Sequence, residues 1–159
     1  MDLQQFSAWL SATPFSLLIQ GTTWAIPAIQ TVHILCLALV LTAALILALR
    51  FMGFGLSAEP LPQLAGRYTR MIWLLLVVLL ASGSLLIVAE PGRTITNPVF
   101  YAKMIMLAVA IMATLWLGAA ARRHGERPLG LHKFVAAFSL VLWIGIIFAG
   151  RFIAYFEST

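Results

Sequence analysis

Two ionisable side chains, His33 and Lys103, stand inside long apolar stretches of this sequence. His33 follows Trp24 by nine residues and Lys103 follows Asn97 by six, which places them roughly 13 Å and 9 Å into a helix. Each needs a chemical reason, because an ionisable group costs free energy inside a membrane. A neutral imidazole at this depth is typical of an axial haem ligand or a copper ligand. A hydrogen bond to Gln30, or to a serine of another helix, is the structural alternative.

The helical neighbours of His33 define what else could take part. At about 100° per residue, Gln30 shares a stripe with His33, and Cys36 lies about 60° away. Copper(I) prefers soft ligands, so a copper site would use His33, Cys36 and a methionine. Methionine is also ordinary core filling, and that interpretation suits most of the methionines that follow Lys103, which are Met104, Met106 and Met112.

Lys103 begins a face of small residues. The face continues with Ala110, Thr114, Gly118 and Ala121. Small side chains let another helix or a flat ligand approach the backbone closely. Lys103 would then lie opposite or beside a haem bound by His33. In the alternative, its long side chain snorkels outward to the membrane surface.

Arg151 lies at a depth similar to that of Lys103, six residues before Glu157. Its guanidinium fork is suited to carboxylates. A haem propionate would qualify as its partner, and so would Glu90 at the end of the second apolar stretch. Both interpretations remain open at this point.

Two further polar groups favour structural roles. Ser82, Gly83 and Ser84 form a small, hydroxyl-bearing patch, which is typical of close helix packing with an interhelical hydrogen bond. His124 and His132 stand in a basic stretch, which predicts a solvated face near anionic lipid headgroups; their neighbours are Arg122, Arg123, Arg127 and Lys133.

Composition and charge spacing determine the elements that must position these residues. Hydrophobic residues make up 62% and charged residues 9%, against roughly 45–50% and 25% in soluble domains. This excludes a soluble globular domain, a disordered chain and a nucleic-acid-binding module. A spanning helix needs about 20 apolar residues. The charge-free runs therefore predict a single transmembrane domain, 1–159, an all-α membrane protein of four transmembrane helices at about 24–51, 69–89, 98–121 and 133–156.

The segment from Leu3 to Gln20 has a different pattern. Apolar Leu3, Phe6 and Leu10 alternate with polar residues, which predicts a short N-terminal interfacial helix. Asp2 is the only charge before Arg50. Without a basic leading segment, we expect no cleaved signal peptide.

Basic residues are unevenly divided between the two predicted sides. Because basic loops stay cytoplasmic, the loops around 53–70 and 122–133 are predicted inside and both termini on the periplasmic side of a bacterial inner membrane. Seven residues support the inner side: Arg50, Arg67, Arg70, Arg122, Arg123, Arg127 and Lys133. Three lie on or near the other side: Arg93, Lys103 and Arg151.

Several motifs resemble a family of small bacterial four-helix membrane proteins classed as a domain of unknown function. They are Trp24-Ala-Ile-Pro27 with Gln30 and His33, Leu49-Arg50-Phe-Met-Gly53, Asn97-Pro-Val-Phe100-Tyr-Ala-Lys103 and Gly150-Arg151-Phe-Ile-Ala-Tyr155. Gln30 and Ala48 stand where acidic residues are common in that family, which argues against an acid-dependent mechanism.

The arrangement is similar, more distantly, to HemJ-type protoporphyrinogen oxidases and to copper-resistance D-type membrane domains. In the HemJ type, a first-span histidine and a third-span lysine belong to the haem site. The resemblance implies analogous places for His33 and Lys103.

Three functions remain as hypotheses. The first is a haem b redox or electron-transfer protein, in which His33 ligates iron and Arg151 holds a propionate. The second is a copper-handling membrane protein. The third is a non-catalytic subunit or assembly factor that packs against a membrane-protein partner or a second copy of the chain. No phosphate-binding loop, HExxH or GxSxG motif assigns an enzymatic reaction.

Overall fold

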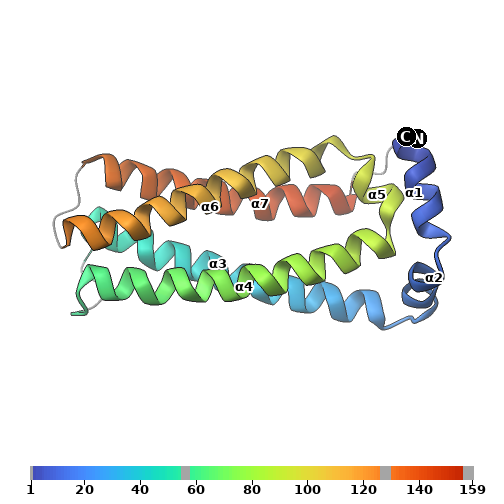
Figure 1. Cartoon of the computed structure of the whole chain (residues 1–159), viewed down its shortest axis with the longest axis horizontal. Coiled ribbons are helices and arrows are strands. Elements are labelled where there is room, and N and C mark those ends of the chain that lie inside the picture. Colours follow the sequence, from blue (N-terminus) through green and yellow to red (C-terminus); the bar gives the residue numbers. More distant parts are fainter. Residues whose placement is uncertain (1, 55–57, 126–129, 156–159) are drawn as a thin grey trace.

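The computed structural model describes residues 2–54, 58–125 and 130–155, which form seven helices (Figure 1). Four of these helices are long and apolar enough to cross a membrane: α3 (Ala25–Met52), α4 (Leu61–Ala89), α6 (Pro98–His124) and α7 (Gly130–Tyr155). They lie side by side in one elongated bundle. The chain is therefore an all-α, multi-pass membrane protein, as the charge-free runs predict.

The bundle buries small and branched side chains and leaves large apolar ones outside. One core cluster surrounds Val40, Ile72 and Trp143, and a second surrounds Phe51 and Leu64. On the outer surface, six large apolar residues are 64–71% exposed: Leu74, Val77, Leu80, Ile105, Met112 and Val141. Lipid acyl chains cover such a surface in a bilayer, where all backbone polar groups are satisfied within the helices.

The helix boundaries differ from the predicted spans mainly in α4. This helix begins at Leu61 rather than at residue 69. The charge-free run begins only after Arg70, but helix geometry continues past it into the polar turns that carry Arg67. Arg67 pairs there with Glu59 at 2.8 Å. α3 ends close to its predicted end, where Gly53 adopts φ +97°. Residue 156, the predicted end of the last span, lies outside the described residues.

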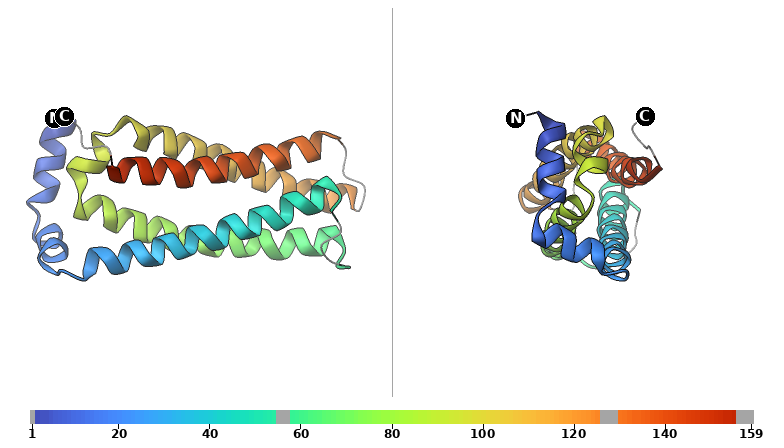
Figure 2. Two further views of the ribbon diagram at one scale, coloured as in Figure 1. Left: turned by 180° about the vertical axis from the view of Figure 1, so that it is seen from behind. Right: turned by 90° about the vertical axis from the view of Figure 1, so that its right-hand side faces the viewer.

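The predicted interfacial helix is two helices, α1 (Leu3–Ser11) and α2 (Pro14–Gly21). The break has a local cause, because Thr13 caps α2 and Pro14 occupies its first position. A proline there would clash with the carbonyl of Leu10 in a continuous helix. Both helices lie across one end of the bundle, with the short helix α5 (Pro91–Ile95) beside α1 (Figure 2). We call this the α1 end and the opposite one the far end.

Buried serine contacts hold α2 on the bundle. Ser16 is fully buried, and its Oγ donates a hydrogen bond to the backbone oxygen of Val88 at 2.7 Å. Gln20 donates to the same Ser16 oxygen at 2.8 Å. Apolar side chains of α1 and α2, among them Trp9 and Leu18, remain exposed. This is the arrangement expected of helices lying at a membrane interface.

Candidate functional site

His33 lies half-buried on α3, in the half of the bundle nearer the α1 end. Its Nδ1 is 2.8 Å from Ser82 Oγ on α4. The Ser82 hydroxyl donates its single proton to the Val78 carbonyl at 2.8 Å. With its proton on the Val78 carbonyl, Ser82 would accept from a protonated Nδ1 of His33, the tautomer that leaves Nε2 unprotonated. Nε2 keeps its lone pair, in the form that serves as a base or a metal ligand.

The small patch predicted in the second span lies at this contact. A Cβ atom on Gly83 would lie 3.5 Å from His33 Cε1, an ordinary van der Waals distance, so the ring packs directly against this part of α4. Ser84, in contrast, is exposed and bonds to the Leu80 carbonyl of its own helix. The patch thus packs against α3 and supplies one interhelical hydrogen bond.

Gln30 is not the partner of His33. Its side chain is exposed, whereas Cys36 and Val40 are buried. Gln30 and Cys36 flank His33 on opposite sides of α3, each about 60° away at 100° per residue. The bundle interior lies on the Cys36 side. Hydrophobic spacing alone does not distinguish these two sides, because both flank His33 by the same angle.

Lys103 reaches across from α6 to α7. Its Nζ lies 3.6 Å from where a Cβ on Gly150 would be, and the amine is close enough to His33 for an electrostatic interaction. Within the described residues Lys103 makes no hydrogen bond or ion pair. The fold therefore brings His33 and Lys103, separated by 69 intervening residues, to one level of the bundle.

The small-residue face that follows Lys103 is a packing surface, as predicted. Ala110 and Ala121 are buried at 0% and 1% exposure. Thr114 is also buried, and its hydroxyl bonds to the Ala110 carbonyl of the same helix. Ala110, Thr114 and Ala121 leave no side-chain polar group without a hydrogen bond. The size of these side chains therefore sets how closely the neighbouring helices can approach.

Arg151 directly follows Gly150 but lies on an exposed side of α7, where it has interactions of its own. The predicted alternative, an ion pair with Glu90, is wrong. Glu90 pairs with Arg93 at 3.0 Å, three residues further along the chain. Of the three residues predicted for the site, the structure thus brings together His33 and Lys103 and leaves Arg151 at its margin.

His132 does not lie on a solvated face. It is 3% exposed, with its ring 5.1 Å from that of Trp116 and 6.3 Å from that of Phe51. The prediction was wrong because α7 begins at Gly130 and already includes this residue. A signal was present in the sequence, since His132, Ala136, Ser139 and Trp143 follow the 4-3-4 spacing of one buried helix face. The side chain of His124 lies outside the described part.

Metal ligands are sparse around His33. Among the described residues, no three histidine, cysteine, aspartate or glutamate side chains come close enough to hold a metal ion. Cys36 is buried one turn deeper than His33, in the core cluster against which Met106 packs. A three-ligand copper site would therefore require the methionine sulfur.

The comparison with protein families covers almost the whole chain. The profile of DUF6644, a family of unknown function, matches residues 8–156. The chain belongs to the DUF6644 family. The matched region includes His33, Ser82, Lys103 and Arg151. Neither a curated protein nor a solved structure matches the chain, so the distant likeness to HemJ-type and copper-resistance D-type proteins gains no support.

Proposed function

We propose that this DUF6644 protein is a haem b-binding redox or electron-transfer component of the bacterial inner membrane, in which His33 would hold the iron. The hydrogen bond between His33 Nδ1 and Ser82 Oγ carries this proposal. Metal-bound histidines almost always donate their second ring N–H to a fixed acceptor, which sets the tautomer and the orientation of the ring. His33 has that acceptor, and its Nε2 is the remaining ligand atom.

The charge beside His33 favours haem over copper. Lys103 holds a positive charge near the imidazole, and the described residues provide no carboxylate to neutralise it. A bare copper cation bound to His33 would be repelled by this charge. Haem b carries two carboxylates, so the same charge would attract it.

The chain's own residues would divide the work of binding. Lys103 would offer an ammonium for one propionate, and a guanidinium for the other would come from Arg151 only if it left its present interaction on the exposed side of α7. Gly83 and Gly150 remove side-chain volume beside His33 and Lys103 respectively. The haem, when bound, would supply a one-electron redox centre that the side chains themselves lack.

An absorption spectrum of the full chain, purified from cells supplied with haem precursor, tests the proposal. We expect a Soret band that His33→Gln abolishes, because an amide replaces a hydrogen bond but is a poor haem ligand. His132→Gln is the matched control, a buried histidine at the far end of the same bundle. A wild-type protein without a Soret band, or a His33→Gln variant that keeps it, would contradict haem binding.

The same preparation separates the alternatives. Copper that co-purifies with the wild type and is lost from His33→Ala would support the copper-handling function instead. A stoichiometric membrane protein that co-purifies in the absence of any cofactor would support a role as a subunit or assembly factor.

The proposed orientation places the far end in the cytoplasm and both termini in the periplasm. The exposed Arg123 lies at the far end, and Cys36 is the only cysteine. In a Cys36→Ala background, Arg123→Cys should react with a membrane-impermeant maleimide only after the cells are lysed. Labelling in intact cells with permeabilised outer membranes would reverse the orientation.

A further inference from the structure

A second polar site lies at the far end, between α4 and α6, and the haem proposal does not use it. Thr69 Oγ1 is buried and has no hydrogen-bond partner among the described residues. The helical threonines Thr31, Thr42 and Thr114 each bond to the carbonyl four residues earlier. Thr69 instead directs its hydroxyl towards α6.

The hydroxyl faces a notch at Gly118. A Cβ atom at Gly118 would lie 3.2 Å from Thr69 Oγ1 and 3.8 Å from Arg122 Nη1. Arg122 is exposed and forms no hydrogen bond or ion pair within the described part of the chain. One glycine notch therefore gathers a guanidinium and a hydroxyl donor. Phosphate oxygens are the acceptors that suit this pair of donors.

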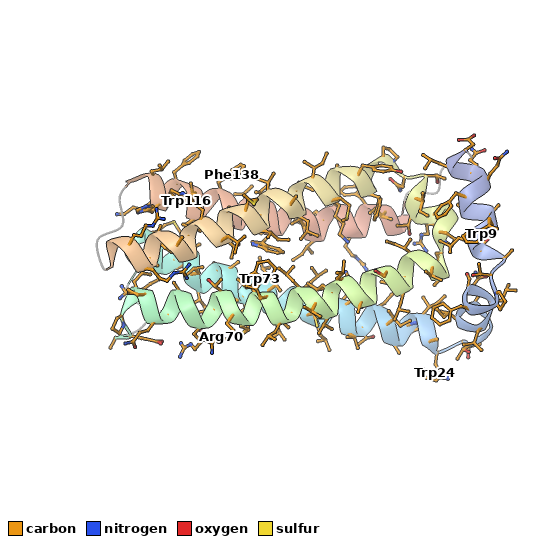
Figure 3. The ribbon with its side chains drawn as sticks, in the orientation of Figure 1. Trp9, Trp24, Arg70, Trp73, Trp116 and Phe138 are labelled. Atoms are coloured by element: carbon orange, nitrogen blue, oxygen red, sulfur yellow. The ribbon has the colours of Figure 1, made fainter. Side chains whose placement is uncertain are left out.

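A small apolar hollow lies between the same two helices, about one turn nearer the middle of the bundle. Its volume is about 10 Å³, and it is lined by Ile72, Trp73 and Leu76 of α4 and by Ile111, Thr114 and Leu115 of α6. In Figure 3, Trp73 lies on the side of α4 that faces α6. Trp73 is 44% exposed, so the hollow opens to the lipid-facing surface. The hollow is too small for a lipid tail, so an acyl chain would lie along the exposed Trp73 ring outside it.

We infer that this seam binds one anionic phospholipid, with its phosphate at Arg122 and Thr69 and an acyl chain along Trp73. Charge complementarity selects this occupant, because the far end carries the exposed Arg67, Arg70, Arg122 and Arg123. Arg122 makes the first contact, and the covered Thr69 hydroxyl donates to the phosphate once the lipid parts the seam. The site is independent of haem binding.

Native mass spectrometry of the purified full chain tests the site, with phosphatidylglycerol compared with phosphatidylcholine. The wild type should bind one phosphatidylglycerol more tightly than phosphatidylcholine. Arg122→Gln should lower the affinity for phosphatidylglycerol about fivefold, which is the effect of one basic residue near an anionic lipid surface. Thr69→Val replaces the hydroxyl with a methyl group. It should also lower the affinity for phosphatidylglycerol and leave the affinity for phosphatidylcholine unchanged.

Arg123→Gln is the matched control, since Arg123 is the adjacent exposed arginine and points about 100° away on the same helix. It should leave the affinity for phosphatidylglycerol at the wild-type value. Equal losses in Arg122→Gln and Arg123→Gln would show a diffuse surface charge and overturn the site. Equal affinity of the wild type for the two lipids would overturn it as well.

Discussion

Ser82 Oγ on α4 lies 2.8 Å from His33 Nδ1 on α3 and 2.8 Å from the Val78 carbonyl of its own helix. When the hydroxyl donates to Val78 and accepts from Nδ1, Nε2 is the ring nitrogen of His33 that can bind a ligand. The bond between His33 and Ser82 also links two helices at a level of the membrane where water is scarce and where an unmade hydrogen bond is costly.

Replacing Ser82 should therefore weaken cofactor binding without unfolding the bundle. In Ser82→Ala, His33 loses the acceptor that fixes its tautomer, and we expect about 10–100-fold weaker haem affinity. Titration of the purified variant with haem measures this. Ser84→Ala removes an exposed hydroxyl that bonds only to its own helix, so it should retain the wild-type affinity. Equal affinities in the two variants would argue against the role given to Ser82.

The small-residue face of α6 should tolerate no added volume. Ala110 has 0% exposure, so Ala110→Leu must displace packed neighbours and should destabilise the protein by about 1–3 kcal/mol. Ala108, two residues earlier, is exposed, and Ala108→Leu should have little effect. Thermal unfolding in detergent compares the two. If Ala110→Leu kept the wild-type melting temperature, the neighbouring helices would be able to move away from this face without loss of stability.

The attachment of α2 should depend on one hydroxyl. Ser16→Ala removes the donor to Val88 O. The free energy that holds α2 on the bundle should fall by about 1 kcal/mol, the usual net value of such a bond. Amide hydrogen exchange should accelerate in α2 and remain unchanged in α7. Ser11→Ala is the control, because Ser11 bonds only to Ala8 of its own helix. Unchanged amide exchange in Ser16→Ala would show that apolar contacts alone hold α2 on the bundle.

Trp143 presents the opposite case, a buried donor without an acceptor. Its side chain is 1% exposed, and its Nε1 has no hydrogen-bond partner in the described residues. Trp143→Phe removes an unsatisfied group that costs about 1–3 kcal/mol, and this offsets the packing lost with the smaller ring. We expect a change in stability within about 1 kcal/mol, whereas Trp143→Ala should cost about 3–5 kcal/mol. A large loss in Trp143→Phe would indicate that the indole N–H bonds to a bound molecule.

The number and placement of the spanning helices could be predicted because charge is excluded from the hydrocarbon region of a bilayer. No charged residue lies between Arg70 and Glu90 or between Lys103 and Arg122, and each interval is about as long as one spanning helix. The ends of the helices could not be read in the same way. α4 and α7 extend beyond the apolar runs, because helical turns in the polar interfacial zone can carry charged side chains without burying them in hydrocarbon.

The sequence by itself determined the fold class, the placement of two ionisable residues, His33 and Lys103, inside spanning segments, and the packing role of Ala110. Only the tertiary structure decided that Ser82 rather than Gln30 contacts His33, that Lys103 reaches Gly150, and that His132 is buried. The physical reason is that composition shows how many residues a helix can hold inside a membrane, but not its rotation about its own axis. Rotation is set by how neighbouring helices pack together, and a turn of about 120° would exchange Gln30 for Cys36 on the inner face.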